Sequence, residues 1–191
     1  MTDVRVHNVA GGAFQRFVGD RVVLRPVMPS DLPFLYEIAN SDKNAFRWRF
    51  RGALPSMEQF EADVNQASYQ HLVALDKESG ALVGYVSAYA YDPSNAVCSV
   101  AVLMAESAVG QRLGREAMEL FITHLFRASP LRKIYAEVPG MTFDGVEESA
   151  INEGLDKRFV IEGRLVDHWW SDGRFVDKII VAIYREQWQA G

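Results

Sequence analysis

Residues 97–127 read VCSVAVLMAESAVGQRLGREAMELFITHLFR, and their pattern is the strongest structural signal in the chain. The first eight residues are apolar or small on both faces, which predicts a strand buried inside a sheet. Apolar residues then recur at helical spacing from Leu113 to Leu125. The free backbone N–H groups of such a helix start, with Arg112 and Arg115 beside them, favour a bound phosphate group. Because every strand-to-helix turn has free N–H groups, this stretch alone leaves phosphate binding open.

The composition indicates one globular domain without a nucleic-acid or membrane partner. The chain has 191 residues, of which 49% are hydrophobic and 24% charged, and its net charge is −5. A net negative charge argues against general affinity for nucleic acids or anionic membranes. The only cysteine, Cys98, lies in the apolar run, and the histidines have no ligand spacing, so no disulfide and no metal site are expected. No apolar run is long enough to span a membrane, and we expect a soluble, cytoplasmic protein.

The order of predicted elements is that of a mixed α/β domain. Residues 1–19 are expected to form an extension, and residues 20–188 a single domain. Strands are expected at 21–27, 71–76, 81–91, 97–104, 132–138, 159–170 and 174–184. Helices are expected at 34–42 after a cap at Ser30-Asp31, and at 56–67, 113–127 and 147–157. The result is a sheet of about seven strands flanked by about four helices.

Three separated stretches resemble one known family. They are VVLRPVMPSDLPFLYEIANSD at 22–42, the segment 97–127, and DGRFVDKIIVAIYREQW at 172–188. Together they resemble the GNAT superfamily of acyl-coenzyme A-dependent N-acyltransferases, nearest to the branch that contains the ribosomal-protein N-terminal acetyltransferases. The resemblance implies the GNAT fold, in which a mixed central sheet splays apart at the cofactor cleft.

The resemblance also implies where acetyl-CoA, or another acyl-CoA, is held. The backbone of the strand end would hold the pantetheine arm, and the following loop would cradle the pyrophosphate. The cofactor-binding residues implied in this way are Val102, Leu103, Met104, Val109, Gly110, Gln111, Arg112, Leu113, Gly114 and Arg115. The family loop carries Arg or Gln, then Gly, then Gly or Ala at the positions of Val109, Arg112 and Gly114, and only Gly114 matches. Arg112 therefore either crowds the phosphate or replaces close backbone approach with charge.

The expected chemistry is attack of a neutral amine on the thioester, assisted by a base and an acid. Ser99 occupies a position where family members often carry glutamate, and a hydroxyl is no base at neutral pH, although it could hold a water; a small polar spacer is the alternative. The family's asparagine and serine positions hold Glu147 and Ala150 here, with Ser149 one residue away. The catalytic candidates are Ser99, Glu137 and Ser149, while Glu147, Glu148, Tyr89 and Tyr91 stay open as acid–base groups.

We expect the acceptor amine to bind between the segment FRWRFRG at 46–52 and the hairpin formed by the expected strands 159–170 and 174–184, which we call the closing hairpin. The substrate candidates are Trp48, Arg49, Arg51, Tyr89 and Trp169, and the arginines favour an acceptor that bears a carboxylate. The alternative is that the tryptophans pack in the core and the arginines are solvated.

The sequence therefore predicts an N-acyltransferase, with acetyl transfer to the amine of a small molecule or to a protein N-terminus. The other hypothesis is a GNAT-fold protein with an altered or lost CoA site that acts on a different small molecule. A homodimer is left open.

Overall fold

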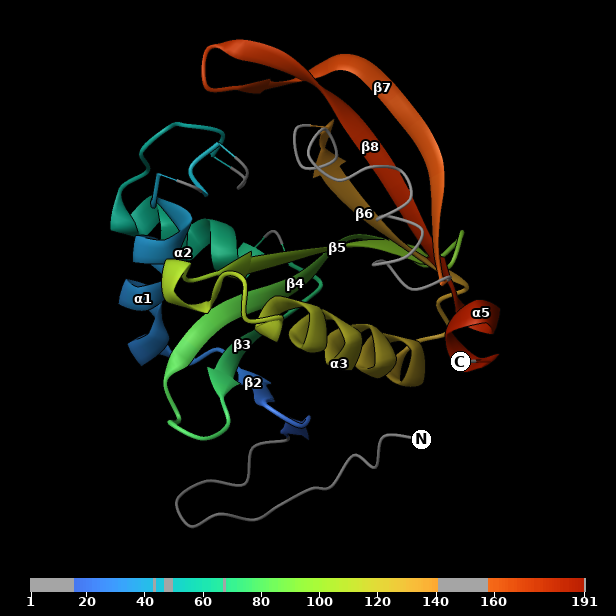
Figure 1. The fold of residues 1–191 in the computed structure, drawn as a ribbon, viewed down its shortest axis with the longest axis horizontal. Coiled ribbons are helices and arrows are strands. Elements are labelled where there is room, and N and C mark those ends of the chain that lie inside the picture. Colours follow the sequence, from blue (N-terminus) through green and yellow to red (C-terminus); the bar gives the residue numbers. More distant parts are fainter. Residues whose placement is uncertain (1–15, 43, 47–49, 67, 141–157, 191) are drawn as a thin grey trace.

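The computed structural model describes residues 16–42, 44–46, 50–66, 68–140 and 158–190, and it places one eight-stranded sheet at the centre (Figure 1). The strand order is β1-β2-β3-β4-β5-β6-β8-β7. The strands are β1 (Phe17–Val18), β2 (Val22–Pro26), β3 (Gln70–Asp76), β4 (Leu82–Asp92), β5 (Val97–Met104), β6 (Lys133–Pro139), β7 (Phe159–Ser171) and β8 (Arg174–Tyr184). Only the β5–β6 pair is parallel; all other neighbours run antiparallel.

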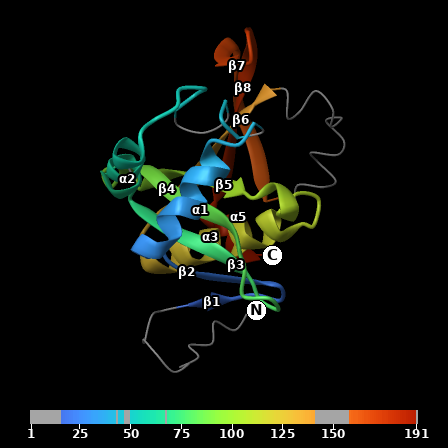
Figure 2. The same cartoon turned by 90° about the vertical axis from the view of Figure 1, so that its left-hand side faces the viewer.

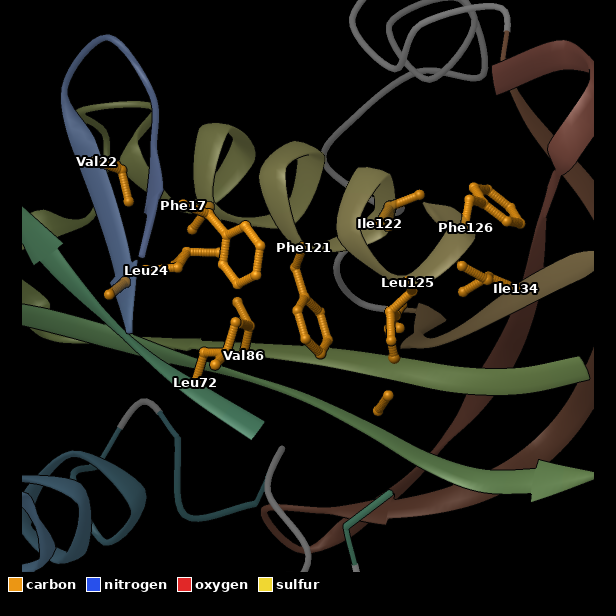
Figure 3. Packing of buried hydrophobic residues seen from close by; sticks show 14 of the residues in the cluster. Phe17, Val22, Leu24, Leu72, Val86, Phe121, Ile122, Leu125, Phe126 and Ile134 are labelled. Atoms are coloured by element: carbon orange, nitrogen blue, oxygen red, sulfur yellow. The ribbon is translucent and has the colours of Figure 1, made fainter. Parts of the chain in front are cut away.

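Helices cover both faces of the sheet, as Figures 1 and 2 show. The helices in the described ranges are α1 (Leu32–Ala39), α2 (Met57–Gln66), α3 (Leu113–Ala128) and α5 (Arg185–Ala190). On one face, α3 buries Phe121 and Leu125 against residues such as Val86 and Ile134 (Figure 3). Each fully buried side chain of this size contributes about 1.5–3 kcal/mol of transfer free energy. On the opposite face, which we call the α1 face, α1 and α2 pack on residues that include Tyr85 and Leu103.

The start of α1 is held by an ion pair rather than by the expected helix cap. Asp31 precedes the helix, but its carboxylate makes no capping hydrogen bond to it. It accepts two hydrogen bonds from Arg25, at 2.6 and 2.8 Å, and one from the Met28 N–H group. Burial by itself would raise the pKa of Asp31, but these hydrogen bonds outweigh it and hold the pKa below its ordinary value. The arginine-proline end of β2 thus fixes where α1 begins.

The predicted elements are confirmed with a few differences. The sheet has eight strands rather than about seven, because β1 lies inside the stretch assigned to the N-terminal extension and pairs with β2. The short helix α5 was not predicted. The helix expected at 147–157 lies outside the described residues. Cys98 is buried, and burial raises the pKa of its thiol to about 12, which makes it an inert core residue.

The closing hairpin of β7 and β8 is bent by two irregularities. The pairing shifts between Ile161 and Gly163 and again between Leu165 and Trp169, so β7 carries extra residues relative to β8. Bulges of this kind bend a strand and increase its twist. The hairpin rises above the rest of the sheet in Figure 2 and arches over the α1 face in Figure 1.

None of the helices in the described ranges has the length and apolar character needed to cross a membrane.

Candidate active site

The two parallel strands part in the middle of the sheet. Their pairing ends at Val100 and Ala136, whereas β5 continues to Met104 and β6 to Pro139. Beyond this point β5 pairs only with β4, and β6 only with β8. Among the described residues, the backbone of β5 after Val100 therefore has no strand neighbour on the β6 side, as the resemblance implied for the pantetheine site.

The loop between β5 and α3 has a backbone that is shaped for an anion. Gly110 has φ +81° and Arg112 has φ +62°, so both adopt the left-handed conformation. Glycine adopts it at no steric cost, whereas an arginine there pays roughly 1–2 kcal/mol. Arg112 thus keeps the backbone shape of the glycine usual in the family, and its exposed side chain adds charge. The Arg21 side chain braces the loop by donating to the Gln111 carbonyl at 2.9 Å.

The helix start lies close against β5 at the one loop position that matches the family. A Cβ atom on Gly114 would lie 3.0 Å from Cγ of Met104 and 4.0 Å from Cγ2 of Val102. The first N–H groups of α3 have no partner within the helix, so this close approach brings them next to the open edge of β5. Val102 and Val109 are exposed beside them and add apolar surface. These residues fit a CoA molecule whose pyrophosphate meets the loop and whose pantetheine follows β5.

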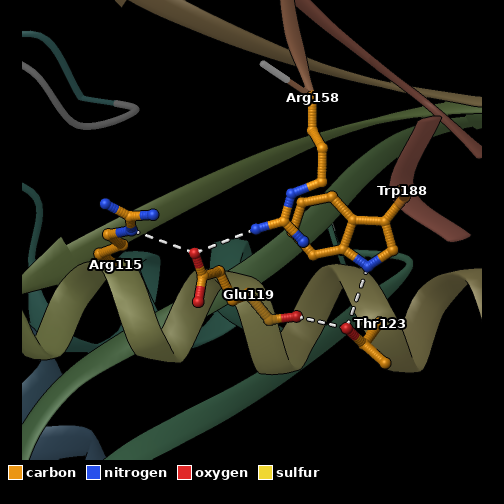
Figure 4. Close-up of polar contacts among 5 residues, drawn as sticks. All are labelled: Arg115, Glu119, Thr123, Arg158 and Trp188. Carbon is orange, nitrogen blue, oxygen red and sulfur yellow. Dashed lines mark hydrogen bonds and ion pairs between the residues drawn. The ribbon is translucent and has the colours of Figure 1, made fainter. Parts of the chain in front are cut away.

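A chain of ion pairs extends from this loop along α3 (Figure 4). Glu119 accepts a hydrogen bond from Arg115 at 3.0 Å and contacts Arg158 at 3.4 Å. The Arg158 guanidinium lies 4.0 Å from the centre of the Trp188 ring. Glu119, Arg158 and Trp188 border a groove of about 490 Å³ along the outer face of α3. The groove contains none of the predicted site residues, so we place the candidate active site at the parting strands.

On the α1 face, the strand register brings together two predicted residues and one that was not predicted. Tyr89 of β4 pairs with Ser99 of β5, which pairs in turn with Tyr135 of β6. Directly opposed side chains on one face have Cβ atoms about 4.5–5.5 Å apart. Ser99 is 9% exposed. The β5 position where family members often carry glutamate therefore holds a serine, in a row of hydroxyl groups on three neighbouring strands.

The predicted acid–base candidate Glu137 is already engaged in an ion pair. Glu137 lies on β6 at the parting, and its carboxylate is 2.7 Å from Nζ of Lys178 on β8. Lys133, on the same face of β6, binds Glu162 at 2.9 and 3.0 Å. Hydrogen bonding with Tyr135, and then with Glu162, raises the pKa of Lys133 and outweighs the effect of burial. Lys133 is therefore a charged ammonium group at neutral pH and not a base.

The loop and the hairpin that were expected to enclose the acceptor do meet. Trp169 is only 5% exposed, and its Nε1 donates to the Phe46 carbonyl at 3.2 Å. The Arg51 guanidinium lies over the Trp169 ring, 3.7 Å from its centre. Trp169 thus connects the hairpin to the segment that contains Phe46 and Arg51, and Arg51 is exposed where the two meet.

Asp177 of β8 holds the bend that carries Trp169 to this place. It accepts the N–H of Asp167 at 2.9 Å and a hydrogen bond from Nε of Arg164. These two hydrogen bonds lower the pKa of Asp177. Asp167 itself has φ +49° in the shifted part of β7.

Three predicted site residues, Trp48, Arg49 and Ser149, lie outside the described residues. Sequence reasoning missed Tyr135 and Lys178. Tyr135 was recognisable, because Lys133, Tyr135 and Glu137 alternate along β6 and form a polar row on one face. Lys178 had no such signal, because its role depends on the pairing of β6 with β8.

Solved structures with the same fold include a spermidine N-acetyltransferase from Vibrio cholerae in complex with CoA and spermine. It is 21% identical, with a TM-score of 0.75, and the match covers 90% of this chain and 99% of that one. A chimera of spermidine N-acetyltransferase from Vibrio cholerae and hSSAT is 19% identical, with a TM-score of 0.74, and the match covers 90% and 100% of the two chains. At these identities the likeness shows the fold. It does not single out the ribosomal-protein branch, which stays a prediction.

No curated protein matches the chain by sequence. A family model described as an acetyltransferase (GNAT) domain matches residues 21–139. This range is more than half of the chain and includes the parting strands, the loop and α3. The chain therefore belongs to the GNAT acetyltransferase family.

Proposed function

We propose that this N-acetyltransferase takes an acetyl group from acetyl-CoA and transfers it to the amine of a small molecule. The observation that carries the proposal is the parting of β5 from β6 beside the start of α3. An open strand edge and a helix N-terminus that meet in this way suit a long ligand with an anionic middle. The solved Vibrio cholerae relative with CoA and spermine supports both a CoA donor and a small amine acceptor.

Residues near the start of α3 would bind the cofactor, and residues on the α1 face of the sheet would bind the acceptor amine. Gly110, Arg112 and the first N–H groups of α3 would bind the pyrophosphate, and Val102 would contact the pantetheine arm. The bound thioester supplies the electrophilic acyl carbon. On the α1 face, the buried Ser99 hydroxyl can orient a water near the acceptor amine. Glu137 and Lys178 form an ion pair where β5 and β6 separate. Ser149 remains a proposed site residue outside the described ranges.

Binding calorimetry with CoA tests the proposal through Arg112. Arg112→Ala removes the charge and should weaken CoA binding by about 1.5–3 kcal/mol, the size of a hydrogen bond to a charged group. Arg112→Gly removes the same charge but adopts the left-handed conformation freely, so it separates charge from backbone shape. Arg174→Ala, an exposed arginine at the far hairpin turn, is the matched control and should bind CoA like the wild type.

The same measurement decides between the two functional hypotheses. Tighter binding by the alanine and glycine variants would mean that Arg112 blocks the pocket. Failure of the wild type to bind CoA or acetyl-CoA would overturn the proposal in favour of a GNAT-fold protein with a lost CoA site.

A further inference from the structure

We propose that the acceptor amine carries an anionic group, a carboxylate or a phosphate, and that Arg51 binds this group. The inference rests on the proposed function and names the class of amine that the same site takes. Four observations support it: the stacking of Arg51, its backbone conformation, the charge of its segment, and its connection through the closing hairpin to the point where β5 and β6 separate.

Stacking holds the guanidinium of Arg51 in place and leaves its donors available. The group lies over Trp169, 3.7 Å from the ring centre, and the ring is fixed by its hydrogen bond to Phe46. A guanidinium that stacks by its face presents its N–H donors at its edge, in a fork that matches carboxylate and phosphate oxygens. None of the ion pairs between described residues involves Arg51. A ligand anion would find a positively charged donor that is already ordered.

The backbone at Arg51 is strained in a way that fixes this position. Arg51 has φ +51° and Gly52 has φ +89°. A Cβ atom at Gly52 would lie 2.6 Å from Cε1 of Phe46, so the chain turns tightly against the residue that also binds Trp169. Non-glycine residues keep such a conformation only where the surrounding structure imposes it, and they cluster at ligand-binding sites. The turn is closed by a hydrogen bond from the Ala53 N–H to the Phe50 carbonyl at 3.0 Å, and it fixes where the Arg51 side chain leaves the backbone.

The charge of the segment favours an anion over a polycation. Residues 43–57 contain one lysine and three arginines but no acidic residue, in a chain whose net charge is −5. A locally basic segment of this kind attracts anions and repels cations. Spermidine and similar polyamines should therefore be poor acceptors here, although the solved relatives are named for them.

The closing hairpin of β7 and β8 connects Arg51 to the point where β5 and β6 separate. Trp169 lies on the hairpin whose strand β8 carries Lys178, and Lys178 binds Glu137 at the parting. The hairpin arches from β6 towards the segment that holds Arg51 (Figure 1). An acceptor on the α1 face can thus present its amine at the parting and its anionic group at Arg51.

Steady-state kinetics with matched amines test the inference. The probes are linear ω-amino carboxylates of increasing length against their neutral amides, ω-aminoalkyl phosphates against the corresponding amino alcohols, and spermidine as the polycation. A series of lengths is needed because the parting and Trp169 lie five residues apart along β8, roughly 16 Å. The wild type should show a higher kcat/KM with the anionic member of at least one pair than with its neutral partner. Comparing the carboxylate pair with the phosphate pair then shows which anion the site takes.

Variants at Arg51 separate recognition from folding. Arg51→Gln should lower kcat/KM for the preferred anionic amine by about 10- to 100-fold, the range expected for a hydrogen bond between charged groups. It should lower kcat/KM for neutral amines by a much smaller factor and leave CoA affinity unchanged, since the only part of the acceptor that Arg51 would contact is the anionic group. Arg51→Lys should restore part of the loss, and Arg174→Gln is the control for removal of one exposed positive charge.

Two outcomes overturn the inference and leave the proposed function intact. One is CoA binding and acetylation with spermidine or neutral amines as the best acceptors. The other is an equal loss for all amines in Arg51→Gln at unchanged thermal stability. If the wild type binds no CoA and acetylates none of the probes, the proposed function fails, and the inference that rests on it fails as well.

Discussion

The proposed cofactor side and the proposed acceptor side of this molecule are built by different means. On the cofactor side, the loop from Ala105 to Arg112 and the start of α3 follow each other directly in the chain, and local backbone conformation makes the site. On the acceptor side, a segment around Arg51 and a hairpin residue more than one hundred positions later, Trp169, meet through one hydrogen bond and one stacking contact.

This difference indicates which changes each side tolerates. A local backbone site survives the replacement of a side chain, and Arg112 shows this by keeping a left-handed conformation where the family usually has glycine. A site assembled from distant segments depends on a few side chains that hold it together. We therefore expect truncation of Trp169, which connects the two segments, to affect folding and acceptor recognition together, and mutations on the cofactor side to affect CoA binding with smaller losses of stability.

The largest effect is expected for Trp169→Ala. This side chain is almost fully buried and joins two segments, and truncation of a buried tryptophan costs about 3–5 kcal/mol. The free energy of unfolding, measured with urea, should fall by an amount near the lower end of this range, because one neighbour is a loop. KM for the acceptor should rise in any variant that still folds, while CoA affinity, measured by calorimetry, changes little.

Trp169→Phe provides the matched control for this experiment. It keeps most of the apolar contact but loses the hydrogen bond to the Phe46 carbonyl, which contributes about 1 kcal/mol. A Trp169→Ala protein with wild-type stability and wild-type acceptor KM would show that the two walls do not depend on this contact.

A smaller effect, on the other side, is expected for Gly114→Val. The new Cβ would lie 3.0 Å from Met104, so that side chain must move and the helix start must shift away from β5. Overpacking of this kind costs about 1–3 kcal/mol. CoA affinity should fall because the free N–H groups of α3 move with the helix start, whereas acceptor KM at saturating CoA should stay near the wild-type value. Gly163→Val, where a new Cβ would lie 3.7 Å from Cδ1 of Ile180 and the backbone is not left-handed, is the control for glycine replacement without crowding.

The sequence predicted the elements of the proposed cofactor side well because that side is local. The branched apolar run, the turn and the helical spacing of 97–127 lie in one stretch, and β5 and α3 lie within one residue of the expected bounds. Arg112 stands at a loop position where the family carries glycine, and its backbone has the left-handed conformation that glycine favours. What the sequence could not show is that Gly114 is required by contact with Met104, because that contact depends on how helix and sheet pack.

The sequence analysis placed the segment 46–52 and the closing hairpin together, and they do meet, but it did not identify the residues that make the contact. Trp169 was expected at the substrate, and the structure places it between two segments, a contact that depends on the bulges of β7. Glu137 was selected as a base, and its partner Lys178 could not be foreseen without the β6–β8 pairing. Asp31 was expected to cap α1 and instead binds Arg25, because capping residues and ion-pair partners share the same chemistry.

The smallest mutational effect is expected at Ser99 and Glu137, and it concerns the proton of the acceptor amine. Ser99 is buried within the sheet and Glu137 is paired with Lys178, so neither is placed as a dedicated base. A dedicated base contributes about 10²–10⁴-fold to the rate, and without one the amine must reach its neutral form by itself. An α-amine, with a pKa near 7.7–8.0, is substantially neutral at pH 8, whereas an alkyl amine near 10.4 is not.

The rate with an α-amine should therefore rise as the pH passes through the pKa of that amine, and the profile for an alkyl amine should be shifted to higher pH by the difference between the two pKa values. Ser99→Ala and Glu137→Gln should each lower kcat by less than about tenfold, which is below the contribution of a general base. The measurement is kcat/KM from pH 6 to 10 for both amines in wild type and both variants, with CoA affinity as the check on folding. A wild-type rate that is flat between pH 6 and 9, or a Glu137→Gln enzyme that binds CoA normally but has lost all activity, would show that the enzyme has a dedicated base. In that case the acceptor side would be as chemically specialised as the cofactor side, and Glu137 would act on the amine despite its contact with Lys178.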